Sequence, residues 1–159
     1  MRLQFVLLTV VALGSPSIHG AEKNNKMPPD LDAALLSASK SILYSLEPIT
    51  EPNPPGPKLQ GFKILGKMKL DQSQTALAVN AFKMAISDWD GVSMACFDPR
   101  QALRITKDGQ TYDLLVCYAC HNLYVYRGNK LFASFGAAGS PQKLNGILTA
   151  AKIPLSATH

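Results

Sequence analysis

The segment from Cys96 to Tyr126 constrains the fold of this chain more than any other stretch. It contains all three cysteines, and its Asp108-Gly109 pair is the strongest turn signal in the sequence. Asp-Gly tolerates the positive φ angles of a two-residue β-hairpin turn. The segment therefore predicts a tight antiparallel hairpin, with strands over 101–106 and 111–118.

A two-residue turn sets the register of this hairpin by simple counting. Lys107 faces Gln110 across the turn. Three steps further out, Arg104 faces Asp113, and opposite charges at facing positions of a sheet predict a cross-strand ion pair. The apolar run 114–116 in the returning strand predicts a central strand that is buried on both faces.

The same register brings the cysteines into one corner. Counted outward, Cys96 arrives near Cys120 and His121, whereas Cys117 lies about 13 Å away at about 3.3 Å per residue. A disulfide needs Cα atoms within about 7 Å of each other. The register therefore favours a Cys96–Cys120 bond over a Cys96–Cys117 bond.

Three interpretations of this cysteine corner follow from the residue types. In the first, Cys96–Cys120 is a structural disulfide and Cys117 is a small core residue. In the second, the chain is a zinc-binding protein whose ligands are Cys96, Cys117, Cys120 and His121, because a C-x-x-C at a strand–turn–strand corner is typical of a zinc knuckle. In the third, Cys117 and Cys120 form the redox pair of a thiol enzyme, although such pairs usually precede a helix and here a strand follows.

The amino terminus has the pattern of a secretory signal peptide over residues 1–20. Arg2 precedes an apolar run over 3–13, and Gly14, Ser15 and Pro16 break that run. This run, which is apolar except for Gln4 and Thr9, is too short to span a bilayer, which needs roughly 20 residues. We therefore expect an exported protein, periplasmic or extracellular, with no stable membrane insertion once residues 1–20 are removed.

Charge excludes one class of partner. The net charge of +5 falls to +4 when the signal peptide and its Arg2 are removed, and no basic run is interleaved with aromatic residues. Such a pattern predicts no nucleic-acid binding. In an oxidising compartment, the odd number of cysteines leaves one thiol over or indicates a metal.

The first part of the mature chain reads as a leader, a helix and a connector. Residues 21–29 predict a flexible leader, and Asp30 is a good N-cap for a helix that ends before Pro48. The apolar positions of this expected helix over 30–47 recur at steps of three and four: Leu31, Leu35, Ala38, Ile42 and Leu46. Five prolines then predict an extended connector over 47–58.

The remaining elements complete a single domain over 30–155. Alternating apolar residues and lysines predict a strand over 62–70, and Asp71 with Gln74 predicts a capping box for a helix over 71–89 that Gly91 closes. Further strands are expected over 122–127 and 130–135, and a last helix starts at Ser140-Pro141 and stops at Pro154. The order predicts an α+β fold with a mostly antiparallel sheet of about five strands and helices packed on it.

The cysteine motifs resemble those of a family of uncharacterised small exported bacterial proteins. The likeness rests on C-F-D-P-R at 96–100, the Asp-Gly turn, and L-L-V-C-Y-A-C at 114–120. Family members share a Cys-x-x-Pro-Arg … Cys-x-x-Cys pattern and often carry His where this chain has Gln101. The resemblance implies a bacterial envelope setting, and it brings no activity, substrate or catalytic residue.

The sequence therefore predicts a non-catalytic binding or structural module of the envelope or extracellular space. No phosphate-binding loop, G-x-S-x-G motif or pair of carboxylates in an apolar setting occurs, so we expect no catalytic residue and no cofactor other than the zinc of the second interpretation. His121 is the one internal histidine of the expected mature domain. Partner and ligand identity stay open at this stage.

Overall fold

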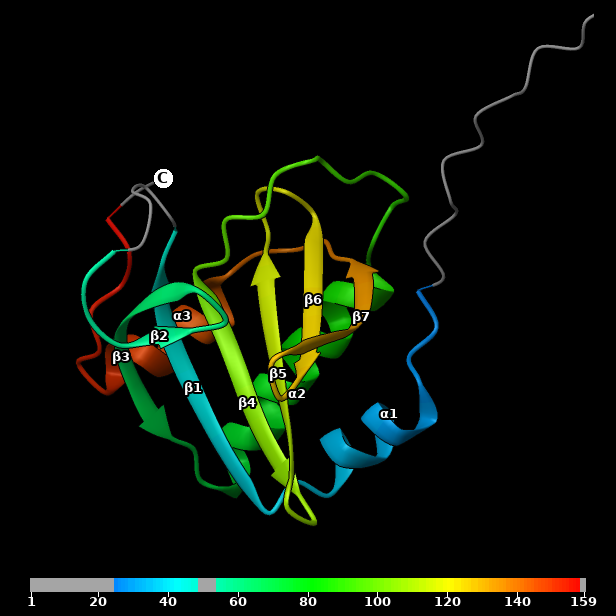
Figure 1. Cartoon of the computed structure of the whole chain (residues 1–159), viewed down its shortest axis with the longest axis horizontal. Helices are drawn as coiled ribbons and strands as arrows, with labels where there is room; N and C mark the ends of the chain where they lie inside the picture. The colour runs from blue at the N-terminus through cyan, green and yellow to red at the C-terminus, as the bar shows by residue number, and fades with distance from the viewer. Residues whose placement is uncertain (1–24, 49–53, 158–159) are drawn as a thin grey trace, which may run out of the picture.

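The computed structural model describes residues 25–48 and 54–157 of the chain. Within these ranges the elements follow one another along the chain as Figure 1 shows. They are α1 (Pro29–Leu36), β1 (Lys40–Glu47), β2 (Lys58–Leu59), β3 (Phe62–Lys69), α2 (Gln72–Ser87), β4 (Gln101–Lys107), β5 (Gln110–Cys117), β6 (Asn122–Arg127), β7 (Lys130–Gly136) and α3 (Gln142–Ala150).

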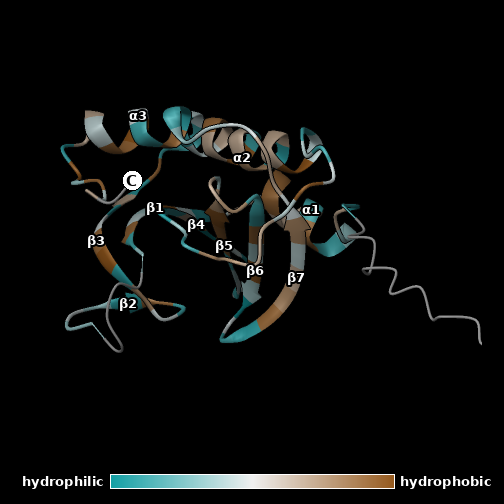
Figure 2. Ribbon diagram, turned by 90° about the horizontal axis from the view of Figure 1, so that it is seen from above, coloured by the Kyte–Doolittle hydropathy of each residue, from teal (hydrophilic) through white to brown (hydrophobic). Residues whose placement is uncertain are grey.

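All of these strands belong to one antiparallel sheet in the order β2-β3-β1-β4-β5-β6-β7. Strands β4 to β7 form a meander, and α2 carries the chain from β3 to β4, on the far side of β1. Figure 2 shows α2 and α3 together on one side of the curved sheet. The α+β prediction is confirmed, but the expected five strands are seven, because β1 and β2 were not predicted.

The main core lies between the sheet and the helices. One face of α2 buries Ala78, Phe82 and Ala85. From the sheet side, fully buried side chains come from alternate positions of the central strands, where successive side chains point to opposite faces. They include Leu43, Leu103, Ile105, Leu114, Val116, Leu123 and Val125.

A second, smaller apolar cluster lies on the opposite face of the sheet. It consists of Tyr44, Leu46, Leu59, Phe62, Ala102 and Leu115. The turn between β2 and β3 carries Gln60 and Gly61 at positive φ, and in Figure 1 this hairpin lies in front of the sheet. Leu114, Leu115 and Val116 are all fully buried, which confirms that β5 is covered on both faces.

The expected single helix over 30–47 is wrong. Helix α1 ends at Leu36, and Lys40–Glu47 is strand β1, paired with β3 on one side and β4 on the other. The four-residue step between Ile42 and Leu46 suits a helix, but it also places two residues on the same face of a strand. Periodicity therefore allows both structures, and pairing with two neighbouring strands decides between them.

The capping box of α2 is confirmed. The Asp71 carboxylate accepts from the backbone N–H of Gln74 at 2.8 Å, and the Gln74 side chain accepts from the backbone N–H of Asp71 at 3.1 Å. Together these bonds satisfy two donors that a helix start would otherwise leave without partners.

Other helix ends differ from the predictions. Helix α1 begins at Pro29, so Asp30 lies in its first turn and is not its N-cap. Helix α3 begins at Gln142 with Pro141 at its N-cap, one residue later than Ser140-Pro141 predicted. Helix α2 ends at Ser87 with Asp88 as its C-cap, so Gly91 does not close it.

The predicted signal peptide, leader and connector lie in segments that the structure describes only in part or not at all. Residues 1–20, the predicted signal peptide, lie outside the described residues, as does 49–53 of the connector. At the described end of the leader, the Asn25 side chain bonds the backbone of Ile86 and Gly136, which joins this segment to α2 and β7. No helix within the described ranges is long and apolar enough to cross a membrane.

Candidate functional site

The predicted cysteine corner forms at the open end of the β4–β5 hairpin. The register agrees with the counting, since Lys107 pairs with Gln110 and Arg104 with Asp113. Cys96 and Cys120 form a disulfide with a Cα–Cα distance of 5.6 Å. The predicted pairing is confirmed.

The disulfide links the irregular segment 88–100, which connects α2 to β4, to the turn between β5 and β6. The Asn122 amide donates to the backbone carbonyls of Met94 and Cys96 at 2.8 and 3.1 Å. Phe97 stacks on Tyr124 with ring centroids 4.0 Å apart. The segment is thereby attached to the start of β6 by covalent, polar and aromatic contacts at once.

Cys117 is the free cysteine of the described residues, and it is buried. Its Sγ accepts the backbone N–H of Cys120 at 3.1 Å. Burial raises the pKa of this thiol, against the smaller opposing effect of hydrogen bonds from the backbone of Asp98 and Cys120. A buried thiol with a raised pKa is largely protonated at neutral pH and is therefore a weak nucleophile.

His121 closes the turn between β5 and β6 in a left-handed conformation, with φ at +56°. Its backbone carbonyl accepts from the Ser93 hydroxyl at 2.9 Å and from the Ala137 N–H at 3.1 Å. Its Nδ1 atom is buried without a hydrogen-bond partner among the described residues. The backbone of His121 thus joins the 88–100 segment to the segment after β7.

The predicted zinc ligands come together only in part. A potential ligand group forms from Cys96, Cys120 and Asp98, whose sulfur and carboxylate atoms lie within 4.8 Å of one another. Two sulfurs that are bonded to each other are not thiolate ligands. Zinc binding by Cys96, Cys117, Cys120 and His121 therefore stays a prediction, and it concerns the reduced chain.

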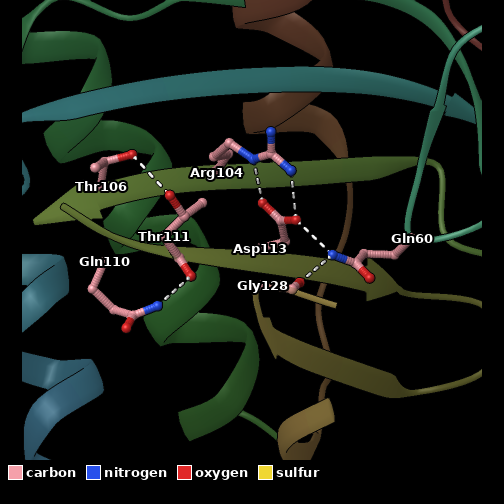
Figure 3. Close-up of polar contacts among 7 residues, drawn as sticks. All are labelled: Gln60, Arg104, Thr106, Gln110, Thr111, Asp113 and Gly128. Atoms are coloured by element: carbon pink, nitrogen blue, oxygen red, sulfur yellow. Dashed lines mark hydrogen bonds and ion pairs between the residues drawn. The ribbon is translucent and has the colours of Figure 1, made fainter. Parts of the chain in front are cut away.

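A polar cluster on the outer face of the sheet stabilises the middle of the same hairpin (Figure 3). Arg104 bonds both oxygens of Asp113, at 2.6 and 2.8 Å, and the side chain of Asp113 is only 2% exposed. Gln60 reaches from the β2–β3 turn and donates to Asp113 at 2.8 Å and to the Gly128 carbonyl at 2.7 Å. The predicted ion pair is confirmed, and the third partner comes from a distant turn.

Two residues of this cluster, Arg104 and Tyr44, have raised pKa values. The hydrogen bond from Arg104 to Asp113 raises the guanidinium pKa. Burial raises the pKa of Tyr44, whose ring lies 5.8 Å below the Arg104 guanidinium carbon. Since the buried carboxylate already has Arg104 and Gln60 as partners, the cluster serves the fold and does not present an open binding site.

A cavity of about 290 Å³ lies beside the cysteine corner. Asp98 and Arg100 line it from the segment before β4, Tyr118 lines it from the β5–β6 turn, and Asn145 lines it from α3. Burial raises the pKa of Tyr118 to about 12. Charged and polar groups from three separate segments therefore converge on one small space.

A larger cavity, of about 710 Å³, lies between α2 and the connection from α1 to β1. Two of its charged lining residues already serve the fold. Lys83 is paired with Asp32 at 2.6 Å, and Asp71 caps α2. The smaller cavity is therefore the better candidate for a ligand site.

Sequence reasoning found the cysteines of this site but missed its cavity. Arg100 lies within the Cys-x-x-Pro-Arg motif and Asp98 two residues after Cys96, and that closeness was the available signal. No local sequence pattern marks Tyr118 or Asn145 as cavity residues. Asn145 lies in α3, which comes near the hairpin only in the tertiary structure.

Comparisons with protein-family models, with curated proteins and with solved structures found no match. The resemblance to uncharacterised exported bacterial proteins therefore stays a prediction.

Proposed function

We propose that this chain is an exported, non-catalytic binding module of the bacterial envelope or extracellular space, in which the cysteine corner is structural. The observation that carries the proposal is the cavity beside the Cys96–Cys120 disulfide. The disulfide anchors the segment that supplies Asp98 and Arg100, so it holds two charged groups at a cavity wall. A disulfide also fits an oxidising compartment outside the cytosol.

The state of the thiols supports a structural role over a thiol enzyme. A redox pair of Cys117 and Cys120 would need both sulfurs for one bond, but Cys120 is bonded to Cys96. The remaining thiol is buried and its pKa is raised. Catalytic cysteines have lowered pKa values and accessible sulfurs.

Zinc binding is the second candidate function, and one observation favours it. Cys96, Cys120 and Asp98 converge within 4.8 Å, and thiolates with a carboxylate are suitable zinc ligands. On reduction, Cys117 and His121 are near enough in sequence to complete the predicted set. This function would require the chain to be reduced where it acts.

Thiol counting with parallel metal analysis on the folded mature protein tests the proposal. We expect one thiol that reacts with Ellman's reagent only after denaturation, and no stoichiometric zinc. Cys117→Ala is the matched control, and it should leave no titratable thiol in the denatured, unreduced chain.

Other outcomes would overturn the proposal in distinguishable ways. Stoichiometric zinc, with thiols that react only after chelation, would establish the second candidate. A thiol that reacts rapidly in the folded protein at neutral pH would indicate a thiol enzyme. Three ordinary thiols without metal would contradict both the disulfide and the zinc site.

A further inference from the structure

Two opposite charges, Asp98 and Arg100, line the cavity beside the disulfide. Within the described ranges they form no ion pair with each other. Elsewhere in the molecule, a close Arg–Asp pair does form, between Arg104 and Asp113 at 2.6 Å. Neither Asp98 nor Arg100 forms an ion pair with any other described residue, so both can bind a ligand.

Arg100 is the inner of the two charges. It is half-buried, and its Nε atom is buried without a hydrogen-bond partner among the described residues. A buried donor without a partner costs free energy, so this atom calls for a partner that the described residues do not supply. A guanidinium group binds carboxylates with two parallel hydrogen bonds, which makes a carboxylate the matching ligand group.

Asp98 is the outer charge. It is exposed, and its carboxylate lies within 4.8 Å of the disulfide sulfurs. Because Cys96 lies only two residues before Asp98, the disulfide restrains the position of this carboxylate. An ammonium group on a ligand is its natural partner.

The rest of the lining suits a small ligand with an aliphatic part. Val116 and Leu155 supply apolar surface, and Tyr118 and Asn145 supply polar groups. The Tyr118 phenol is protonated at physiological pH and can donate a hydrogen bond, and burial raises its pKa further, to about 12. The volume of about 290 Å³ lies just below the roughly 300 Å³ at which typical ligand sites begin, so only a small ligand fits.

We propose that this cavity binds a small zwitterion of the free aliphatic amino-acid class, with its carboxylate on Arg100 and its ammonium group on Asp98. The inference rests on the proposed function as a binding module and names its ligand class. Two opposite charges on one small cavity distinguish such a ligand from a simple anion, which would be repelled by Asp98.

Isothermal titration of the mature, disulfide-bonded protein tests this assignment with three related probes. L-leucine carries both charges, N-acetyl-L-leucine carries only the carboxylate, and L-leucinamide carries only the ammonium group. We expect L-leucine to bind, and each single-charge probe to bind about tenfold more weakly or worse, because each loses one charge-assisted contact. L-alanine and L-valine, as smaller zwitterions, test the fit of the aliphatic part.

Two variants assign the charges to their residues. With Arg100→Met, L-leucine should bind no better than L-leucinamide, because the carboxylate has lost its partner. With Asp98→Asn, L-leucine should bind no better than N-acetyl-L-leucine. Arg127→Met and Asp108→Asn are the matched controls, since both residues lie outside the cavity lining, and they should leave L-leucine binding unchanged.

The proposal is overturned if none of the three zwitterions binds up to millimolar concentration, or if a single-charge probe binds as tightly as L-leucine. It is also overturned if both cavity variants, folded by their thermal unfolding midpoints, bind L-leucine like the unaltered chain. Thiol counting separates these failures from a failure of the proposed function, because a structural disulfide would still be found when the ligand class is wrong.

Discussion

The two ends of the β4–β5 hairpin are formed by different kinds of contact, local at one end and long-range at the other. At the closed end, Asp108 and Gly109 take positive φ angles of 50° and 76°, and two adjacent residues suffice to reverse the chain. At the open end, the structure depends on a disulfide across 24 residues and on a cavity wall supplied by α3. Local chemistry therefore builds the turn, and distant residues build the candidate site.

The largest expected effect lies between these ends, at the buried ion pair. Arg104→Met leaves Asp113 with Gln60 as its remaining side-chain partner, and an uncompensated buried charge costs about 3–5 kcal/mol. We expect the free energy of unfolding, measured in urea, to fall by about 3 kcal/mol. Lys67→Met, which removes an exposed charge from β3, is the control and should change it by less than about 0.5 kcal/mol. Equal losses of unfolding free energy in the two variants would show that the Arg104–Asp113 pair stabilises the fold no more than an exposed charge does.

Removing the disulfide should lower the stability of the whole domain and loosen the open end of the hairpin the most. A closed loop of this length stabilises a chain by about 3–4 kcal/mol in the chain-entropy description. The double variant Cys96→Ser/Cys120→Ser should lose about 3 kcal/mol and also speed amide hydrogen exchange in segment 88–100. It is preferable to a single variant because Cys117 could otherwise pair with the remaining cysteine. An increase in exchange rate at residues 107–110 as large as that in segment 88–100 would contradict the independence of the two ends.

Tyr118 makes the open end sensitive to alkaline pH. Its pKa is raised by burial to about 12, above an ordinary value of about 10. The folded chain thus holds this proton more tightly, so the contribution to stability is complete below about pH 10 and is lost as pH rises through about 12. Two pKa units correspond to about 2–3 kcal/mol.

Urea unfolding between pH 9 and pH 12 measures this loss. Tyr118→Phe should lose about 2 kcal/mol less than the unaltered chain over that interval, because it has no phenol to ionise. Parallel pH profiles for the two proteins would contradict the raised pKa of Tyr118.

The closed end should respond to backbone conformation only. Gly109→Ala places a side chain at φ +76° and should cost about 1–2 kcal/mol. Gly146→Ala is the matched control, because this helical glycine has open space around it and should stabilise the chain by about 0.5–1 kcal/mol. Asp108→Asn should be nearly neutral, since Asn-Gly suits the same turn. A change in L-leucine binding on Gly109→Ala would show that the two ends are coupled.

Prediction from sequence succeeded where neighbouring residues determine the geometry. The hairpin register and the capping box of α2 both follow from short-range rules, and the register alone was enough to pair Cys96 with Cys120. Prediction failed at Lys40–Glu47, where the apolar spacing suits a helix as well as a strand buried on both faces. It also failed for β2, since a two-residue strand has almost no pattern of its own.

By itself, the sequence determined the α+β class, the central hairpin and the cysteine corner. A turn type, a cap and a strand register depend on residues that are close along the chain, so their signals survive without the tertiary structure. Only the tertiary structure decided that Lys40–Glu47 is a strand and that Arg100, Tyr118 and Asn145 share one cavity. Those outcomes depend on which segments pack side by side, and local spacing does not encode that choice.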